Sequence, residues 1–285
     1  MDEQPVALIS AVPFESAILE EEIAKEIGRE KELKKKLGSD PFFSRKTIRR
    51  GPLDIRSGRF GSLPFVIANS GVGKVNAAMT TTLLAQEFNP FLVISFGVGG
   101  AYPGSKLQPG DLALAAEEIF PDEGVMTSKG LFLPIEAMGY PLVSTREYPS
   151  SSQRKKQAGR QKKLNSFPLD TDFLTEARKA LRKSGIDFRT GTFLTVSTGT
   201  GTILQARKLR RKYGAICENM EGGAVAQVCY VFKVPLIEVR GISNLVENRD
   251  RRRWRVKPAA QRVQQAVLVM LRSFARTLPL KSIIN

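Results

Sequence analysis

The chain has 285 residues with 42% hydrophobic content, enough to bury a full core, and residues 1–285 are expected to form one domain. It contains no histidine, which excludes Ser-His and Cys-His nucleophilic chemistry and histidine-rich metal sites. The formal net charge of +16 arises largely in local basic clusters, and basic inserts are expected near 25–55 and 147–165.

Hydrophobic periodicity predicts strands and helices in alternation along the chain. A strand at 6–12 comes first, and a long helix begins at Phe14; the charged segment up to Arg50 extends this helix and ends as a loop. Three isoleucines are expected on one face of this helix, Ile18, Ile23 and Ile27. Later strands are expected at 65–68, 92–96, 111–115, 192–196 and 234–239, and later helices at 75–88, 171–184, 203–213 and 258–278. Strands separated by such helices predict an α/β fold, a three-layer αβα sandwich with a mixed central β-sheet.

Cysteine usage and hydropathy favour a location in the cytoplasm. Cys217 and Cys229 lack CxxC spacing, so they are expected to be buried thiols rather than zinc ligands or a disulfide. No segment approaches the roughly 20 apolar residues that span a bilayer, and the N-terminus lacks the order of a signal peptide. The basic clusters lack interleaved aromatic residues, so solvated loops are the simpler interpretation and no specific nucleic acid is expected.

Two glycine-rich stretches invite a nucleotide-binding interpretation, and both fail in detail. Gly73-Lys74 resembles the end of a P-loop, but Ala68 and Val75 stand where that motif needs glycine and Ser or Thr. The run Gly97 to Gly100 begins like a dinucleotide fingerprint, yet Tyr102 occupies the last glycine position. A tight turn remains for each, either as simple geometry or with close backbone approach to a small ligand.

The most informative stretch runs from Glu218 to Trp254. Within it, Glu221 begins an Ala/Val-rich helix, where the helix dipole and backbone donors favour an ionised carboxylate. Such a carboxylate can accept two hydrogen bonds from a vicinal diol. The strand at 234–239 then leads into Arg240 to Asn244 at its C-terminal end, where open α/β sheets usually bind ligands. Polar groups are therefore expected to converge at this edge.

Separate segments of the chain agree in order with one known family. These segments are Ala11 to Glu15, SGVGKVNA at 70–77, Gly97 to Gly110, TVSTGTGT at 195–202, the NMEGG turn, and RGISN followed by NRDRRRW. The chain resembles the nucleoside phosphorylase and nucleosidase superfamily, and within it the futalosine hydrolases. The resemblance implies hydrolysis of a purine N-glycosidic bond, a small-molecule nucleoside substrate, a homodimer, and no metal or organic cofactor.

The resemblance also implies roles for individual residues. Glu15 is expected to position and deprotonate the attacking water, held with the help of Ser70 and Arg240; without the motif, a lone surface carboxylate is the simpler interpretation of Glu15. Glu221 would grip the ribose 2′ and 3′ hydroxyls, with Met220 beneath the sugar. The wall of the base pocket is expected to include Gly100, Thr198, Gly199 and Thr200.

Asn244 narrows the expected substrate. Adenine-releasing relatives carry aspartate at this position, whereas an amide can donate towards N7 and O6 of a 6-oxopurine but cannot act as an acid. Asn219 also replaces an acid of those relatives. Trp254 matches the aromatic residue over the 5′ substituent, where Arg252 or Arg253 could pair with the carboxylate of futalosine, unless these arginines simply form a solvated face.

Water is the expected nucleophile, because related phosphorylases usually carry an arginine just ahead of the central glycine turn, where Ser95 and Phe96 stand here. Three alternatives stay open. They are a purine nucleoside phosphorylase, an adenine-releasing nucleosidase acting on methylthioadenosine, adenosylhomocysteine or aminofutalosine, and a basic nucleic-acid-binding protein with a decayed pocket.

Overall fold

A mixed β-sheet forms the centre of the molecule. The computed structural model describes residues 3–36, 46–50, 53–139, 142–143, 165–169 and 171–277. The strands of the sheet in this part of the chain are β1 (Val6–Ser10), β2 (Lys46–Arg50), β3 (Leu53–Phe60), β4 (Leu63–Asn69), β5 (Leu92–Ala101), β6 (Leu112–Ile119), β9 (Ser166–Pro168), β10 (Arg189–Thr195), β11 (Cys217–Asn219) and β12 (Leu236–Leu245). Their order is β11-β10-β6-β12-β5-β1-β4-β3-β2, with β9 paired to β6.

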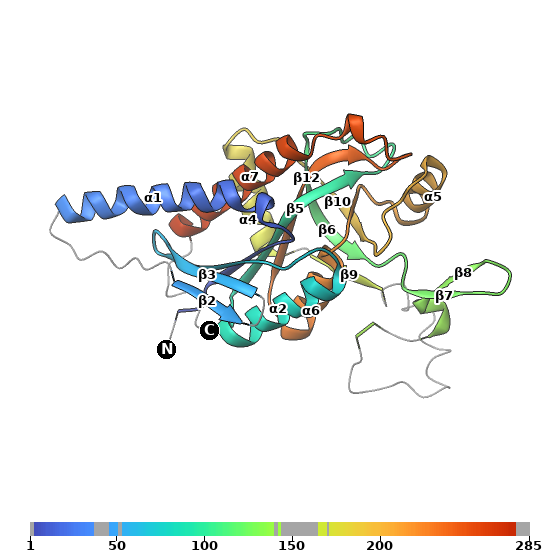
Figure 1. The fold of residues 1–285 in the computed structure, drawn as a ribbon, viewed down its shortest axis with the longest axis horizontal. Coiled ribbons are helices and arrows are strands. Elements are labelled where there is room, and N and C mark those ends of the chain that lie inside the picture. The colour runs from blue at the N-terminus through green and yellow to red at the C-terminus, as the bar shows by residue number, and fades with distance from the viewer. Residues whose placement is uncertain are drawn as a thin grey trace.

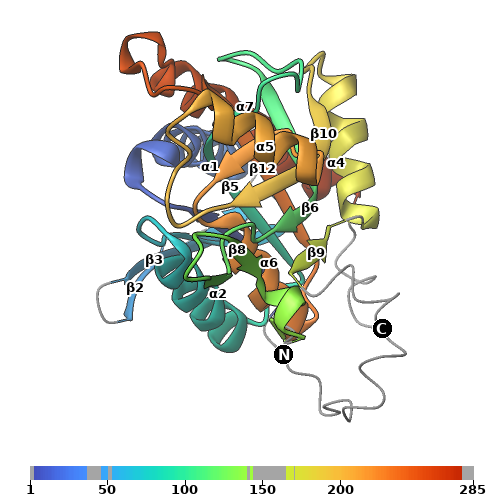
Figure 2. The same cartoon turned by 90° about the vertical axis from the view of Figure 1, so that its right-hand side faces the viewer.

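Helices cover both faces of this sheet (Figures 1 and 2). The longer helices are α1 (Ala17–Lys36), α2 (Lys74–Phe88), α4 (Asp172–Lys183), α5 (Ile203–Tyr213), α6 (Gly222–Phe232) and α7 (Val256–Thr277). Helix α7 packs on β5 and β12 and is flanked by α1 and α4, whereas α2 and α6 pair on the opposite face. A small hairpin of β7 (Gly124–Met126) and β8 (Phe132–Pro134) lies beyond the sheet (Figure 1). The predicted αβα sandwich is confirmed.

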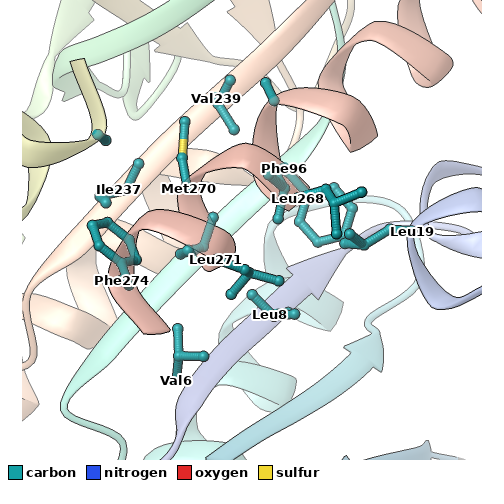
Figure 3. Packing of buried hydrophobic residues seen from close by; sticks show 14 of the residues in the cluster. Val6, Leu8, Leu19, Phe96, Ile237, Val239, Leu268, Met270, Leu271 and Phe274 are labelled. Atoms are coloured by element: carbon teal, nitrogen blue, oxygen red, sulfur yellow. The ribbon is translucent and has the colours of Figure 1, made fainter. Parts of the chain in front are cut away.

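The apolar core lies on both faces of the sheet because successive strand residues point to opposite sides. Along β1, Val6 and Leu8 pack towards α7, where they meet Leu271 (Figure 3). Ala7 and Ile9 belong to the second cluster, on the side of α2 and α6. A strand buried on both faces reads as a continuous apolar run in the sequence, and this is why β1 was predictable.

The predicted face of the first long helix is wrong at one position. Ile23 is 3% exposed and Ile27 packs against the core, but Ile18 is 38% exposed. Five residues of an α-helix turn through about 500°, so Ile18 points about 140° away from Ile23. Leu19, four residues before Ile23, takes the buried position instead and is 1% exposed.

The segment 46–50 was expected to be a loop, and this prediction is also wrong. It forms β2, which pairs antiparallel with β3 at the edge of the sheet. Its sequence, KTIRR, has the charged composition that discourages further pairing of an edge strand, and this composition also hides the strand from a prediction based on hydropathy.

Of the insert near 147–165, Asn165 alone lies within the described residues. None of the helices described has the length and apolar character to cross a membrane.

The run Gly97 to Gly100 lies within β5, so the expected tight turn is wrong there. These glycines instead make room for side chains from other elements. A Cβ at Gly97 would lie 2.6 Å from Oε1 of Glu15, and a Cβ at Gly100 would lie 2.8 Å from Cγ2 of Val246. Gly73, in contrast, has φ of 96° and forms the turn that precedes α2, as expected.

Candidate active site

Glu15 is a buried carboxylate at the turn after the first strand. It ends the 3-10 helix η1 (Pro13–Glu15) and is 3% exposed, so it is not a surface carboxylate. Its Oε2 accepts a hydrogen bond from the amide of Ala11 at 3.0 Å, and its Oε1 accepts one from the amide of Val98 at 2.8 Å. Burial raises the pKa of Glu15 above its ordinary value, against the lowering effect of Arg240 and of the amides of Val98 and Val12. A carboxyl with a raised pKa is suited to act as a base nearer neutral pH.

Glu221 stands at the N-cap of α6, at the helix start that its sequence context predicts. Its Oε1 accepts a hydrogen bond from the amide of Gly73 at 2.9 Å, and its Oε2 lies 3.5 Å from Nη1 of Arg240. The residue is 8% exposed. Because each carboxylate oxygen has two lone pairs, each oxygen of Glu221 retains capacity for a further donor.

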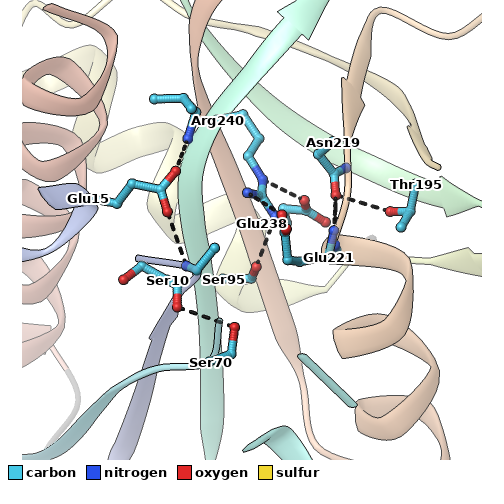
Figure 4. A network of polar contacts seen from close by, with 12 residues as sticks. Ser10, Glu15, Ser70, Ser95, Thr195, Asn219, Glu221, Glu238 and Arg240 are labelled. Carbon is cyan, nitrogen blue, oxygen red and sulfur yellow. Dashed lines mark hydrogen bonds and ion pairs between the residues drawn. The ribbon is translucent and has the colours of Figure 1, made fainter. Parts of the chain in front are cut away.

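Both acids lie near Arg240, a β12 residue that is 1% exposed (Figure 4). Glu221 pairs with it, and Glu15 interacts with it electrostatically. Its register partner on β5 is Gly97, and a Cβ there would lie 2.9 Å from Nη1 of Arg240 and 2.6 Å from Oε1 of Glu15. Glu15 thus approaches the guanidinium across a glycine, while Glu221 approaches it from α6. Burial alone would lower the pKa of Arg240, but Glu238, Glu221 and Glu15 raise it, so Arg240 stays charged.

Asn244 follows Arg240 by four residues along β12, roughly 13 Å at the usual rise of a strand. It pairs with Gly100 of β5. The hydroxyl of Ser243 donates to its Oδ1 at 2.7 Å, and its Nδ2 donates to the carbonyl of Leu245 at 2.9 Å. A carbonyl cannot donate, so these partners fix which end of the amide is nitrogen. The second N–H of Asn244 is not used by these contacts.

Asn219 lies beneath Glu221 and caps the first turn of α6. Its Oδ1 accepts hydrogen bonds from the amides of Glu221 at 2.9 Å and Gly222 at 2.7 Å, and its Nδ2 donates to Glu118 at 2.6 Å. With 4% exposure, Asn219 is engaged by protein atoms on both ends of its amide. Met220, next to it, is half-buried at the same turn.

Ser70 is buried just after β4, where β1 and β4 end together. Its amide donates to the carbonyl of Ser10 at 2.9 Å, and its hydroxyl donates to the carbonyl of Gly71 at 2.8 Å. The hydroxyl also lies 3.4 Å from the carbonyl of Ser10 (Figure 4). These contacts hold the loop next to the turn of Glu15. A direct role for Ser70 in holding water stays a prediction.

The loop after β10 is anchored by Glu218. Thr200 is buried, and its amide and hydroxyl donate to the two oxygens of Glu218 at 2.9 and 2.5 Å. The hydroxyl of Tyr102 donates to the same carboxylate at 2.6 Å, and burial followed by Glu218 raises the pKa of Tyr102, so the phenol keeps its proton. Thr198 is exposed and Gly199 half-buried on the outer side of this loop.

Trp254 is half-buried at the end of the 3-10 helix η4 (Arg251–Arg253). The guanidinium of Arg249 lies 5.2 Å from its ring centroid, and that of Arg251 lies 5.9 Å away. A Cβ at Gly199 would lie 3.2 Å from Nη1 of Arg249. Arg249 therefore lies between the indole and the loop that was expected to line the base pocket.

The two arginines singled out from the sequence have other contacts. Arg252 is paired with Asp250 at 2.9 Å and Arg253 with Glu247 at 3.0 Å, and both arginines are exposed. The structure thus brings Arg249, rather than these two, against Trp254.

Sequence analysis missed three buried groups that surround Arg240 and Asn219. Nε of Arg240 donates to Glu238 at 2.9 Å, and its Nη2 donates to Ser95 at 3.5 Å. Glu118 accepts from Asn219. Glu118 and Glu238 are both fully buried. An acid inside an otherwise apolar predicted strand, 234–239, was the available signal for Glu238.

Fold and site together define an α/β protein with buried carboxylates grouped around one arginine in the middle of the central strand β12. The sequence profile of the phosphorylase superfamily matches residues 5–276. The chain belongs to this superfamily, which confirms the membership predicted from the order of its motifs.

Among its relatives, the futalosine hydrolase of Thermus thermophilus is 32% identical over 207 residues, 73% of this chain and 81% of that protein. The futalosine hydrolase of Streptomyces coelicolor is 34% identical over 204 residues, 70% of this chain and 74% of that protein. The 5′-methylthioadenosine/S-adenosylhomocysteine nucleosidase of Staphylococcus haemolyticus is 28% identical over 193 residues, 67% of this chain and 73% of that protein.

Solved structures share the fold over nearly the whole chain. The futalosine hydrolase of Helicobacter pylori has a TM-score of 0.73 at 18% identity, covering 94% of this chain and 97% of that one. The 5′-methylthioadenosine/S-adenosylhomocysteine nucleosidase of Neisseria meningitidis has a TM-score of 0.72 at 21% identity, covering 95% of this chain and 99% of that one.

Proposed function

We propose that this chain hydrolyses the N-glycosidic bond of futalosine and releases hypoxanthine and dehypoxanthine futalosine, a step in the futalosine route of menaquinone biosynthesis. The observation that carries this proposal is the convergence of Glu15 and Glu221 on Arg240, with Asn244 further along the same strand. The futalosine hydrolases at 32% and 34% identity support the choice of substrate.

Glu15 and Glu221 would act at the ribose end of the substrate. Cleavage builds positive charge on the ribose, as in glycoside hydrolysis. Glu221 would accept hydrogen bonds from the 2′ and 3′ hydroxyls with the capacity that Gly73 and Arg240 leave free, and Met220 would pack beneath the sugar. Glu15 would take a proton from the attacking water. Its raised pKa and its fixed contacts with two backbone amides support this role.

Asn244 would act at the purine end of the substrate. Its remaining N–H would donate to the purine as negative charge develops on the departing hypoxanthine. Since an amide N–H is too weak an acid to transfer its proton, the proton that completes hypoxanthine would come from solvent or from another group. This chemistry favours a 6-oxopurine over a 6-aminopurine, because the 6-amino group of adenine would meet a second donor.

For the 5′ side of futalosine, the contacts favour Arg249 over Arg252 and Arg253. Futalosine carries a carboxyphenyl group on this side. Trp254 would pack against its ring, and Arg249 would pair with its carboxylate, since Arg252 and Arg253 are already paired with acids.

Three further features complete the proposal. Residues 1–285 would act as one domain, because Glu15 near one end and Arg240 near the other approach the same centre. Two copies would form a homodimer through exposed apolar side chains such as Val75, which is 82% exposed on α2. Both cysteines are buried free thiols, as predicted, and this supports a reducing compartment such as the cytoplasm.

One experiment tests the assignment. The purified chain is incubated with futalosine, inosine, adenosine and methylthioadenosine, with and without phosphate, and the free base is followed by chromatography. Hypoxanthine released from futalosine without phosphate is the expected result. Release of adenine would assign the chain to the adenine-releasing nucleosidases, and dependence on phosphate would assign it to the phosphorylases.

Light scattering on the wild type and on Val75→Asp tests the proposed dimer, which the substitution should weaken.

A further inference from the structure

Glu118 and Glu238 form a buried acidic pair behind the site. Glu118 projects from β6 and Glu238 from the neighbouring strand β12, and both are 0% exposed. Besides burial, Glu238 raises the pKa of Glu118, as expected of a second carboxyl group within hydrogen-bonding reach. Two ionised carboxylates are acceptors only, so a hydrogen bond between them requires a proton. Oε2 of Glu238 is buried and finds no donor as long as both groups are ionised, which points to the same missing proton.

Each member of the pair holds a different part of the site. Glu118 accepts from Nδ2 of Asn219, whose Oδ1 in turn receives the amide of Glu221. Glu238 accepts from Nε of Arg240. The pair therefore joins the cap beneath Glu221, the proposed ribose-binding residue, to the guanidinium that lies near Glu15, the proposed base.

The start of α6 shows which member carries the negative charge. Gly222 is the first residue of this helix, and a Cβ there would lie 2.1 Å from Oε1 of Glu238 and 2.3 Å from its Oε2. Glycine is required because the carboxylate fills that space. The positive end of a helix dipole favours an ionised group, so Glu238 is the better site for the charge and Glu118 for the proton.

We propose that Glu118 and Glu238 hold one proton between them, carried by Glu118, so that ionised Glu238 fixes Arg240 and limits the positive charge that Arg240 presents to Glu15. They are positioning residues, and the inference rests on the proposed role of Glu15 as the base. Without Glu238, the charge of Arg240 would act on Glu15 uncompensated and make it a weaker base.

The surrounding charges agree with this distribution. Burial, followed by Glu238, raises the pKa of Glu118 well above its usual range. Burial also raises the pKa of Cys217, so this neighbouring thiol stays neutral. The titratable and charged groups that face the network are Glu15 on η1, Glu118 on β6, Cys217 and Glu218 on β11, Glu221 at the start of α6, and Glu238 and Arg240 on β12.

A matched pair of variants tests the inference through the pH profile of kcat/KM for futalosine. In E238Q, the acid limb should move to lower pH by about one unit and kcat should fall, because Glu15 becomes a weaker base. In E118Q, the limb should stay where it is in the wild type, because a neutral amide replaces a neutral carboxyl and can still donate to Glu238. An unmoved limb in E238Q, or equal shifts in both variants, overturns the proposal.

A second measurement does not depend on activity and so separates this inference from the proposed function. Because the folded protein raises the pKa of Glu118, its contribution to stability is greatest below the ordinary value of 4.5 and is lost as pH rises towards the folded value. E118Q lacks this loss. The difference in Tm between E118Q and the wild type should therefore shift in favour of E118Q as pH rises from about 5 to about 8. A difference that stays constant over this range would mean that Glu118 does not hold the proton. If the wild type leaves futalosine intact, the proposed function fails, and this comparison still decides whether Glu118 holds the proton.

Discussion

The carboxylate of Glu15 occupies the space beside Gly97 where any larger residue would place its Cβ, 2.6 Å from Oε1. Gly97→Ala must therefore displace Glu15 or Arg240, whose Nη1 would lie 2.9 Å from the new methyl group. We expect kcat/KM for futalosine to fall by about 100-fold, because a displacement of 1 Å in a catalytic group has an effect of this order.

The matched control for that substitution is Gly28→Ala, since a Cβ at Gly28 meets nothing within 4 Å. Steady-state kinetics and circular dichroism on both variants separate loss of the site from loss of the fold. Wild-type kinetics in Gly97→Ala would contradict the arrangement of Glu15 across this glycine.

The pH dependence of the reaction should report on Glu15. A general base must be ionised, so activity should fall as pH falls through the pKa of Glu15, which burial raises above the ordinary 4.5. The acid limb of kcat/KM should lie correspondingly high. Glu15→Gln should lower kcat by about 10²- to 10⁴-fold while binding, measured by calorimetry with substrate, stays close to the wild type. Full turnover in this variant would end the assignment of Glu15 as the base.

Glu221→Gln should act mainly on binding. An amide cannot accept at both ends, so the variant loses an acceptor for a ribose hydroxyl or for the amide of Gly73, together with the ion pair to Arg240. We expect KM to rise by about 10- to 100-fold, in line with the loss of a hydrogen bond to a charged group. The comparison of futalosine with its 2′-deoxy analogue checks the diol contact, since the two should differ less in the variant than in the wild type.

Asn244→Asp should change the preferred base. A carboxyl that shares a proton with purine N7 and accepts from a 6-amino group suits adenine, whereas the present amide can only donate at its free position. Release of hypoxanthine should fall and release of adenine from aminofutalosine should rise. An unchanged ratio of the two kcat/KM values would place base recognition elsewhere.

Arg249 and Arg252 offer a paired test of the 5′ side. Arg249→Gln should raise KM for futalosine by about tenfold or more through loss of a charge-assisted contact, while leaving inosine, which lacks the carboxylate, unaffected. Arg252→Gln is the control, since Arg252 is exposed and already paired with Asp250. If KM rose in Arg252→Gln and not in Arg249→Gln, the result would favour Arg252, one of the two arginines expected from the sequence.

Two of the proposed site residues lie just after a buried strand, in the strand-to-helix context that the sequence predicts. Glu15 follows β1 and Glu221 follows β11. Arg240 was expected just after a strand that ends at 239, but it lies inside β12, which continues to Leu245. Positions like those of Glu15 and Glu221 can be predicted from the sequence because an apolar run, a turn and a polar residue occur in order within a few residues. The same reasoning supplied the alternation of elements and therefore the sandwich.

Features that depend on contacts between distant segments could not be predicted from the sequence. A glycine inside a strand looks like a glycine in a turn, and only the approach of Glu15 distinguishes Gly97. Glu118 resembles the polar end of a strand until Thr195 of β10 and Asn219 of β11 donate to its carboxylate. The preference for Arg249 over Arg252 likewise depends on how the loop folds back on Trp254.

Trp254 is the only tryptophan in the chain. Its indole lies against the guanidinium groups of Arg249 and Arg251. Fluorescence excited at wavelengths that tryptophan absorbs and tyrosine does not therefore originates at a single corner of the molecule. Cations held against an indole perturb its emission. The unmodified chain therefore carries its own optical reporter, and events at this corner can be followed without attaching a dye.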